Sequence, residues 1–148
     1  MQILRTTSEN QNFQSLVQKL DAYLAEMDGD DHAFYDQYNK IDLLKNCIVI
    51  FENEKLVACG AIKPIDENTM EVKRMFTLPE YRGKGFAGSV LKELEIWTKE
   101  LGYEKTVLET GKKQTEAVAL YKKCNYTIIP NYGQYAGIEN SVCFEKIL

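Results

Sequence analysis

A glycine-rich loop at residues 82–88 separates an apolar, strand-like run from a long amphipathic helical pattern. The strand-like run covers residues 70–78, and Pro79 ends it because proline has no backbone N–H to donate to a sheet. After the loop, apolar residues recur at the spacing of one helix face as far as Leu101, and Gly102 is a natural stop. Any fold of this chain must accommodate this strand–loop–helix unit.

The composition of the loop predicts an anion-binding site. Backbone N–H groups at the start of a helix have no intrahelical partner, and the helix dipole adds positive potential there. Glycine lets the backbone approach a ligand closely. Arg82 and Lys84 bring positive charge to the same place. The combination indicates a phosphate or pyrophosphate ligand.

The other patterns predict one α/β domain, as the length of 148 residues also favours. Strands mixed with helices in this order imply a mixed sheet with helices on both faces. A helical pattern covers residues 13–27, with Ser8 as its predicted N-cap. The other expected elements are an edge strand at Ile3 and Leu4, a helix at 31–39, a hairpin of strands 47–51 and 56–63, a strand at 105–108 broken by Thr110-Gly111, a helix at 117–124, and strands at 127–129 and 142–147.

Composition argues against several classes of protein. The net charge of −4 gives no electrostatic footprint for nucleic acid. No apolar run reaches the length of a membrane span, and the N-terminus has no signal pattern, so we expect a cytoplasmic protein. The four cysteines form no Cys-x-x-Cys pair and the chain has one histidine, so we expect reduced core thiols and no metal site.

Two other phosphate-binding patterns bear on the loop. The P-loop pattern Gly-x-x-x-x-Gly-Lys-Ser/Thr does not occur, which argues against ATP or GTP use through it. Gly83-x-Gly85-x-x-Gly88 does match dinucleotide-binding spacing, with Glu109 as the acidic residue expected on the ribose. However, residues 79–82 separate these glycines from their strand, and this is the only convincing strand–helix–strand unit. A dinucleotide-binding oxidoreductase is therefore the weaker alternative.

Arg82-x-x-Gly85-x-Ala87 resembles the coenzyme A pyrophosphate loop of the GNAT superfamily of N-acetyltransferases. The run EVKRMFTLPEYRGKGFAGSVLKELE resembles the central strand, loop and helix of that family, and LETGKKQTEAVALYKKCNY resembles its next strand and helix. Asn125 replaces the glycine usual in the second segment, but asparagine also tolerates positive φ. The resemblance implies a single N-acetyltransferase domain over residues 1–148 with the GNAT fold, a mixed, mostly antiparallel sheet flanked by helices.

The resemblance also implies transfer of an acetyl group from acetyl-CoA to an amine of a small molecule or protein, by direct attack in a ternary complex. The backbone of one strand would follow the pantetheine arm, the loop amides would hold the pyrophosphate, and one glutamine would lie near coenzyme A. The cofactor-binding residues so implied are Met75, Phe76, Thr77, Arg82, Gly83, Lys84, Gly85, Phe86, Ala87, Gly88 and Gln114.

Two catalytic residues follow from the same resemblance. Tyr121 matches the tyrosine that assists the departing thiolate, although spacing alone would make it a core aromatic. Glu71 stands eleven residues before Arg82, where some members of the family carry a general base. Strand alternation predicts that Glu71, Lys73, Met75 and Thr77 share one face, and pairing of Glu71 with Lys73 is the competing interpretation.

The amine acceptor cannot be named from the sequence, because a fold does not fix its substrate. The acidic charge slightly favours a cationic small amine. His32 and the aromatic loop that contains Tyr132 and Tyr135 are candidates for shaping acceptor choice. A non-catalytic module that binds coenzyme A or acyl-CoA is the other alternative.

Overall fold

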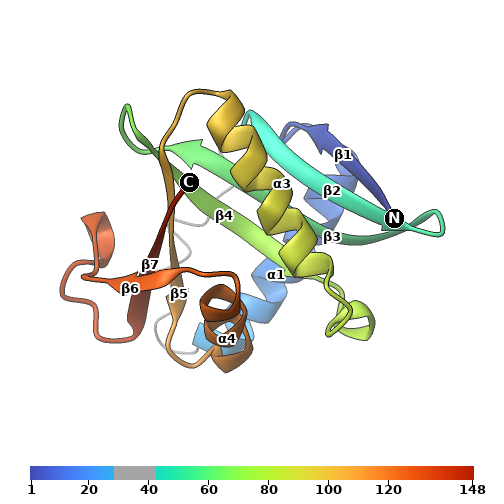
Figure 1. Cartoon of the computed structure of the whole chain (residues 1–148). Helices are drawn as coiled ribbons and strands as arrows, with labels where there is room; N and C mark the ends of the chain where they lie inside the picture. The colour runs from blue at the N-terminus through green and yellow to red at the C-terminus, as the bar shows by residue number, and fades with distance from the viewer. Residues whose placement is uncertain (29–42) are drawn as a thin grey trace.

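The computed structural model describes residues 1–28 and 43–148. A seven-stranded sheet with the order β1-β2-β3-β4-β5-β7-β6 forms the centre of the molecule. Helix α3 packs across one face of β2, β3 and β4, and α1 packs on the opposite face of the same strands (Figure 1). The elements are β1 (Gln2–Thr6), α1 (Gln11–Asp28), β2 (Asn46–Glu52), β3 (Lys55–Pro64), β4 (Thr69–Thr77), η2 (Pro79–Tyr81), α3 (Phe86–Glu100), β5 (Lys105–Gly111), α4 (Thr115–Lys123), β6 (Thr127–Ile129), η3 (Gly133–Tyr135) and β7 (Ser141–Ile147).

Among the described strands, β4 and β5 are the one parallel pair. Helix α3 provides the crossover between them, as a parallel connection requires. The predicted mixed, mostly antiparallel sheet is confirmed. A dinucleotide-binding domain is built from repeated parallel strand–helix–strand units, so this topology argues against the oxidoreductase alternative.

The two faces of the sheet bury separate apolar clusters. Val90, Leu91 and Leu94 of α3 pack on the side chains that β2, β3 and β4 present to that face. Phe13 and Leu16 of α1 belong to the cluster on the other face. Successive residues of the central strands therefore pack into the apolar clusters on opposite faces of the sheet. Because both faces are covered, the sequences of β2 and β3 are continuous apolar runs.

A β-bulge at Arg74 changes which face of the sheet the following residues of β4 point to. The register to β3 shifts between Cys59 and Ala61, and Arg74 has a φ of 60°. Before the bulge, Glu71 faces the α1 side of the sheet, whereas after it Met75 packs on the α3 side. The expectation that Glu71, Lys73, Met75 and Thr77 share one face is therefore wrong, because strict alternation fails across a bulge.

Most predicted elements are confirmed, with local corrections. Asn10, not Ser8, caps α1, since its Oδ1 accepts a hydrogen bond from the backbone N–H of Phe13 at 3.0 Å. The Ser8 hydroxyl instead accepts from the backbone N–H of Leu44 at 3.2 Å. Strand β5 continues through the predicted break to Gly111, because its antiparallel pairing to β7 runs that far. The helix expected at 31–39, and with it His32, lies outside the described residues.

The four cysteines carry free thiols, and Cys47, Cys59 and Cys143 are buried as expected. Burial raises the pKa of each of these three thiols; that of Cys47 rises to about 12 and that of Cys143 to about 11. They are therefore core residues rather than nucleophiles. In the described part of the chain, no helix is both long enough and apolar enough to cross a membrane.

Candidate active site

Strands β4 and β5 diverge, and the site lies where they separate. Their parallel pairing runs only from Thr69 opposite Lys105 to Glu71 opposite Val107. Beyond that point β4 continues to Thr77 and β5 to Gly111 without pairing to each other. Beyond Glu71, the edge of β4 that faces β5 is therefore not paired to that strand.

A groove with a volume of about 540 Å³ follows the diverging part of β4. Its size is typical of a small-molecule site. The groove is bounded by α1, the glycine loop, the start of α3 and α4. It brings together ten of the eleven predicted cofactor-binding residues: Met75, Phe76, Thr77, Arg82, Gly83, Gly85, Phe86, Ala87, Gly88 and Gln114.

Lys84 is the predicted cofactor-binding residue that does not line this groove. Its ammonium lies 5.3 Å from the centre of the Tyr81 ring. The Lys84 side chain is exposed and its ammonium packs on that ring.

The glycine loop presents backbone N–H groups to the groove. Gly83 and Gly85 have φ values of 77° and 89°, which side chains larger than hydrogen rarely adopt. Gly85 immediately precedes α3. The N–H of Ser89 donates a hydrogen bond to the carbonyl of Gly85. The first N–H groups of α3, at residues 86–88, therefore have no intrahelical acceptor and can bind an anion.

Arg82 fixes the shape of this loop. Its Nε donates a hydrogen bond to the carbonyl of Thr77 at 3.0 Å. Its guanidinium lies 5.3 Å from the centre of the Tyr23 ring and 5.6 Å from that of Phe76. The side chain thus ties the loop to the end of β4 and to α1, and Arg82 lines the same groove as residues 86–88.

Tyr121 of α4 is buried at the junction of two cavities. Its ring packs against Tyr126 and Phe144, with centroids 5.9 Å away in each case. The residue lines the large groove and also a smaller cavity of about 120 Å³. Burial raises the pKa of Tyr121 well above its ordinary value, so the phenol keeps its proton at neutral pH and can donate a hydrogen bond.

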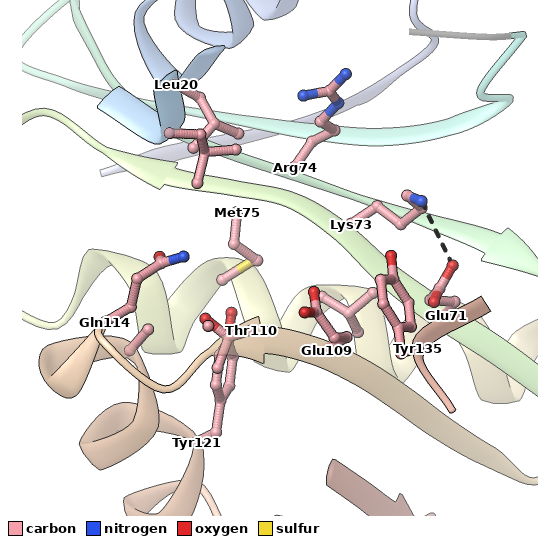
Figure 2. Close-up of a pocket in the computed structure, with 14 residues that line it drawn as sticks. Leu20, Glu71, Lys73, Arg74, Met75, Glu109, Thr110, Gln114, Tyr121 and Tyr135 are labelled. Atoms are coloured by element: carbon pink, nitrogen blue, oxygen red, sulfur yellow. Dashed lines mark ion pairs between the residues drawn. The ribbon is translucent and has the colours of Figure 1, made fainter. Parts of the chain in front are cut away.

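The smaller cavity has two chemically different ends (Figure 2). Gln114, Met75 and Tyr121 lie at one end. At the other end Glu71 and Tyr135 approach each other, and Glu109 points into the space between the two ends. A carboxylate and a tyrosine hydroxyl therefore lie at the end of the cavity away from Gln114.

Glu71 is held by two partners. The Tyr132 hydroxyl donates a hydrogen bond to its Oε2 at 2.5 Å, and the ammonium of Lys73 lies 3.6 Å from its Oε1. The predicted pairing with Lys73 is present. The aromatic loop reaches the smaller cavity, because Tyr132 contacts Glu71 and Tyr135 lines the cavity. Its influence on the choice of acceptor stays a prediction.

The sequence does not point to Glu109 as part of this cavity. It offers Glu109 only as a ribose ligand in the dinucleotide alternative, whereas the residue lines the smaller cavity. The Ser141 hydroxyl donates a hydrogen bond to its Oε2 at 2.7 Å. Strand alternation was the available signal, since Val107 and Glu109 share a face of β5 that Leu108 does not.

Comparisons with known proteins agree on one family. The model of the acetyltransferase (GNAT) family matches residues 13–126. The uncharacterized N-acetyltransferase YsnE of Bacillus subtilis is 32% identical over 100 residues, which are 66% of this chain and 66% of that protein. The IAA acetyltransferase of Azospirillum brasilense is 30% identical over 135 residues, which are 90% of this chain and 88% of that protein.

Solved structures with the same fold are also found. A protein provisionally named an acyl-CoA N-acyltransferase, from Klebsiella pneumoniae, is 27% identical with a TM-score of 0.82, and the match covers 99% of this chain and 97% of that one. A GNAT family acetyltransferase from Elizabethkingia anophelis, solved with acetyl-CoA bound, is 20% identical with a TM-score of 0.69, and the match again covers 99% and 97% of the two chains. The fold and the family prediction are confirmed by these matches.

Proposed function

The chain belongs to the GNAT family of N-acetyltransferases, and we propose that it transfers the acetyl group of acetyl-CoA directly to an amine of a small molecule or protein. One observation carries this proposal. A single groove joins the helix N-terminus that can bind an anion to the buried Tyr121 hydroxyl. The pyrophosphate and the thioester of coenzyme A lie at opposite ends of a long flexible arm, so its site needs both features.

The residues along the groove fit coenzyme A. The N–H groups at residues 86–88 would bind the pyrophosphate, and Arg82 adds positive charge beside them. The diverging backbone of β4 at residues 75–77 would pair with the amides of the pantetheine arm, because β5 does not occupy that edge. Gln114, which precedes α4, lines both cavities and would contact the arm near its end.

Tyr121 would act on the leaving group. Acetyl-CoA supplies an activated acyl carbonyl, and expulsion of its thiolate develops negative charge on sulfur. A phenol that keeps its proton can donate a hydrogen bond to that charge or transfer the proton. The rings of Tyr126 and Phe144 hold the phenol in place. The acceptor amine would approach through the smaller cavity, which opens onto the same hydroxyl.

Calorimetric titration with acetyl-CoA, with NAD as control ligand, tests the groove assignment. Thiol release in the presence of spermidine, glycinamide, an aliphatic hydrazide and an aminoglycoside then tests turnover. We expect binding of acetyl-CoA alone, and turnover with at least one amine. Tyr121→Phe should lower kcat by about 10²–10³-fold and leave acetyl-CoA affinity within about twofold.

Three results would overturn parts of this proposal. Binding of acetyl-CoA without turnover, and insensitive to Tyr121→Phe, would indicate a non-catalytic acyl-CoA-binding module. Binding of NAD alone would support the dinucleotide alternative. Full activity of Tyr121→Phe would remove the tyrosine from the reaction while leaving the acetyl transfer intact.

A further inference from the structure

Arg74 of β4 is a buried arginine that lines the smaller cavity. Its side chain is 2% exposed, and its Nη1 donates a hydrogen bond to Oδ1 of Asp21 on α1 at 2.7 Å. Its Nε and Nη2 atoms are also buried, and within the described residues neither has a hydrogen-bond partner. Buried donors without a partner are rare in folded proteins because they lose their hydration without compensation. The two free donors of Arg74 therefore point to a ligand.

These two donors lie on one edge of the guanidinium. The Nε–H and Nη2–H groups are coplanar and point the same way, whereas Asp21 is bound by Nη1. An edge of this kind binds both oxygens of a carboxylate through two parallel hydrogen bonds. The cavity has a volume of only about 120 Å³, which favours this compact, planar anion over a phosphate. The free edge of Arg74 thus fits a carboxylate.

The bulge in β4 places two successive cations on the same side of the sheet. Val72 and Met75 both pack in the cluster on the α3 side. Between them, Lys73 pairs with Glu71, which faces the α1 side, and Arg74 pairs with a residue of α1 itself. Figure 2 shows the Arg74 side chain on the opposite side of β4 from Met75. The φ of 60° at Arg74 is costly for a residue other than glycine, and such strain is concentrated at ligand sites.

The charged side chains around the smaller cavity are of both signs. Among the described lining residues, the cations are Lys73 and Arg74, and the anions are Glu71 and Glu109. A polyamine would meet two like charges there, and so would a dicarboxylate. A molecule with one ammonium and one carboxylate can instead place each group near an opposite charge. The cavity therefore differs from the chain as a whole, whose net charge of −4 favours a simple cation.

We propose that the acceptor is a small amino acid, whose carboxylate binds to Arg74 while its amino group receives the acetyl group. This rests on the proposed acetyl transfer and names the class of acceptor. Binding requires the side chain to turn its Nε–Nη2 edge toward the cavity, and these N–H groups lose no hydrogen bond in that movement. Arg74 is thus a specificity-determining residue that holds the far end of the acceptor and does not touch the reacting atoms.

Matched pairs of acceptors test the carboxylate. Glycine, β-alanine, 4-aminobutyrate and L-leucine are each compared with their own primary amide, by thiol release at saturating acetyl-CoA. Rates are expressed per concentration of free amine, because the carboxylate raises the pKa of the neighbouring amine. In at least one pair, kcat/KM should be about 30-fold or more higher for the acid than for the amide. The length of the preferred acid then gives the separation of the two binding ends.

Two variants break the same ion pair from opposite sides. Arg74→Met removes the guanidinium, and it should bring the ratio of acid to amide below about threefold, chiefly through the KM of the acid. Asp21→Asn leaves the free edge of Arg74 in place, so it should not lower the ratio. Arg74→Lys keeps the charge but not the edge, and it should give an intermediate ratio. The ratio of two acceptors in one variant does not depend on how much of the protein is folded.

A measurement on the wild-type protein keeps the proposal testable if Arg74→Met does not fold. Butyrate carries the carboxylate without the amine, so it should inhibit competitively against the acceptor and not against acetyl-CoA. Butyramide at the same concentration should not inhibit.

Three outcomes would overturn the assignment and leave the acetyl transfer intact. They are a preference for the amide in every pair, an equal loss of acid and amide activity in Arg74→Met, and a fall of the ratio in Asp21→Asn as large as in Arg74→Met. The last two would indicate that the ion pair is structural. Absence of wild-type turnover with these acceptors and with every amine of the panel above would instead overturn the proposed function itself.

Discussion

The Tyr132 hydroxyl donates a 2.5 Å hydrogen bond to the Glu71 carboxylate, although the two residues are 61 positions apart in the sequence. This bond ties the loop between β6 and β7 to the central strand β4. Hydrogen bonds to charged groups contribute more to stability than neutral ones. The contact therefore links two segments that are distant in the sequence at the wall of the smaller cavity.

Removal of this contact should destabilise the protein. We expect Tyr132→Phe to lower the free energy of unfolding by about 1.5–3 kcal/mol, because a partly buried hydrogen bond to a carboxylate is lost. Urea denaturation followed by circular dichroism measures the change. Tyr103→Phe is the control, since within the described residues the Tyr103 hydroxyl has no hydrogen-bond partner, and it should cost less than about 0.5 kcal/mol. Equal losses in the two variants would contradict the prediction.

Stability should fall at alkaline pH because of three buried tyrosines and one that is half-buried. Burial raises the pKa of each phenol above its ordinary value of 10.0. The folded chain thus binds these protons more tightly than the unfolded chain. Their contribution to stability is complete below pH 10 and is lost as the pH rises above it. The residues are Tyr121, Tyr126, Tyr132 and Tyr135.

Urea denaturation at pH 8, 10 and 11 measures this effect. The free energy of unfolding should be nearly constant up to about pH 9.5 and then fall, by at most about 1.4 kcal/mol per pH unit for each tyrosine. Tyr126→Phe should make the fall less steep. A free energy that stays flat to pH 11 would show that the phenols titrate alike in the folded and unfolded chains.

The sequence predicted the features that local chemistry determines. The glycine loop, its strand and its helix are encoded by neighbouring residues, so the anion-binding end of the groove could be predicted directly. The apolar patterns also gave nearly all the strands. The sequence favours Ser8 as the N-cap of α1, although Asn10 is the cap, because serine and asparagine are both common caps. The Ser8 hydroxyl instead accepts a hydrogen bond from the backbone N–H of Leu44, a partner far away in the sequence.

Non-local contacts explain what the sequence did not predict. The bulge at Arg74 depends on pairing with β3, where Gly60 leaves space for Met75, and no pattern within β4 marks it. The position of Glu109 beside the smaller cavity depends on the divergence of β5 from β4. That divergence is a property of two strands together, so a residue beside it has no local sequence signature.

Gly60 is needed because three side chains crowd it. A Cβ atom there would lie 2.6 Å from Met75 Sδ and from Val90 Cγ1, and 3.1 Å from Leu94 Cδ1. Gly60→Ala should therefore destabilise the protein by about 1–3 kcal/mol through overpacking. Gly88→Ala is the control, because a Cβ atom there meets nothing within 4 Å and alanine favours the helix by up to about 1 kcal/mol. Thermal denaturation that ranks Gly60→Ala at or above wild type would contradict this account.

The turn between β2 and β3 holds Glu54 in a strained backbone conformation that a glycine would relieve. Asn53 and Glu54 have φ values of 50° and 68°, as a two-residue type I′ turn requires. Glutamate is disfavoured at positive φ, whereas Asn-Gly is the preferred pair for this turn. Glu54→Gly should therefore raise the free energy of unfolding by about 0.5–1 kcal/mol in urea. Lys55→Gly, at the first residue of β3, should lower it instead. A loss of stability in Glu54→Gly would show that the turn is not strained.

Arg82 should affect binding of acetyl-CoA more than the chemical step. Its Nε bond to Thr77 and its contact with the Tyr23 ring hold the loop that precedes the α3 amides. Arg82→Ala should raise the KM for acetyl-CoA about tenfold, equivalent to about 1.4 kcal/mol, and change kcat less than threefold.

Arg82→Lys should give an intermediate KM, because lysine keeps the charge but cannot reproduce the planar, stacked guanidinium. The control is Lys92→Ala, which removes the same charge from an exposed position on α3 and should leave KM within about twofold. Steady-state kinetics with varied acetyl-CoA separates the two parameters. A fall in kcat at constant KM would contradict this prediction, because it would mean that Arg82 acts on the chemical step rather than on binding.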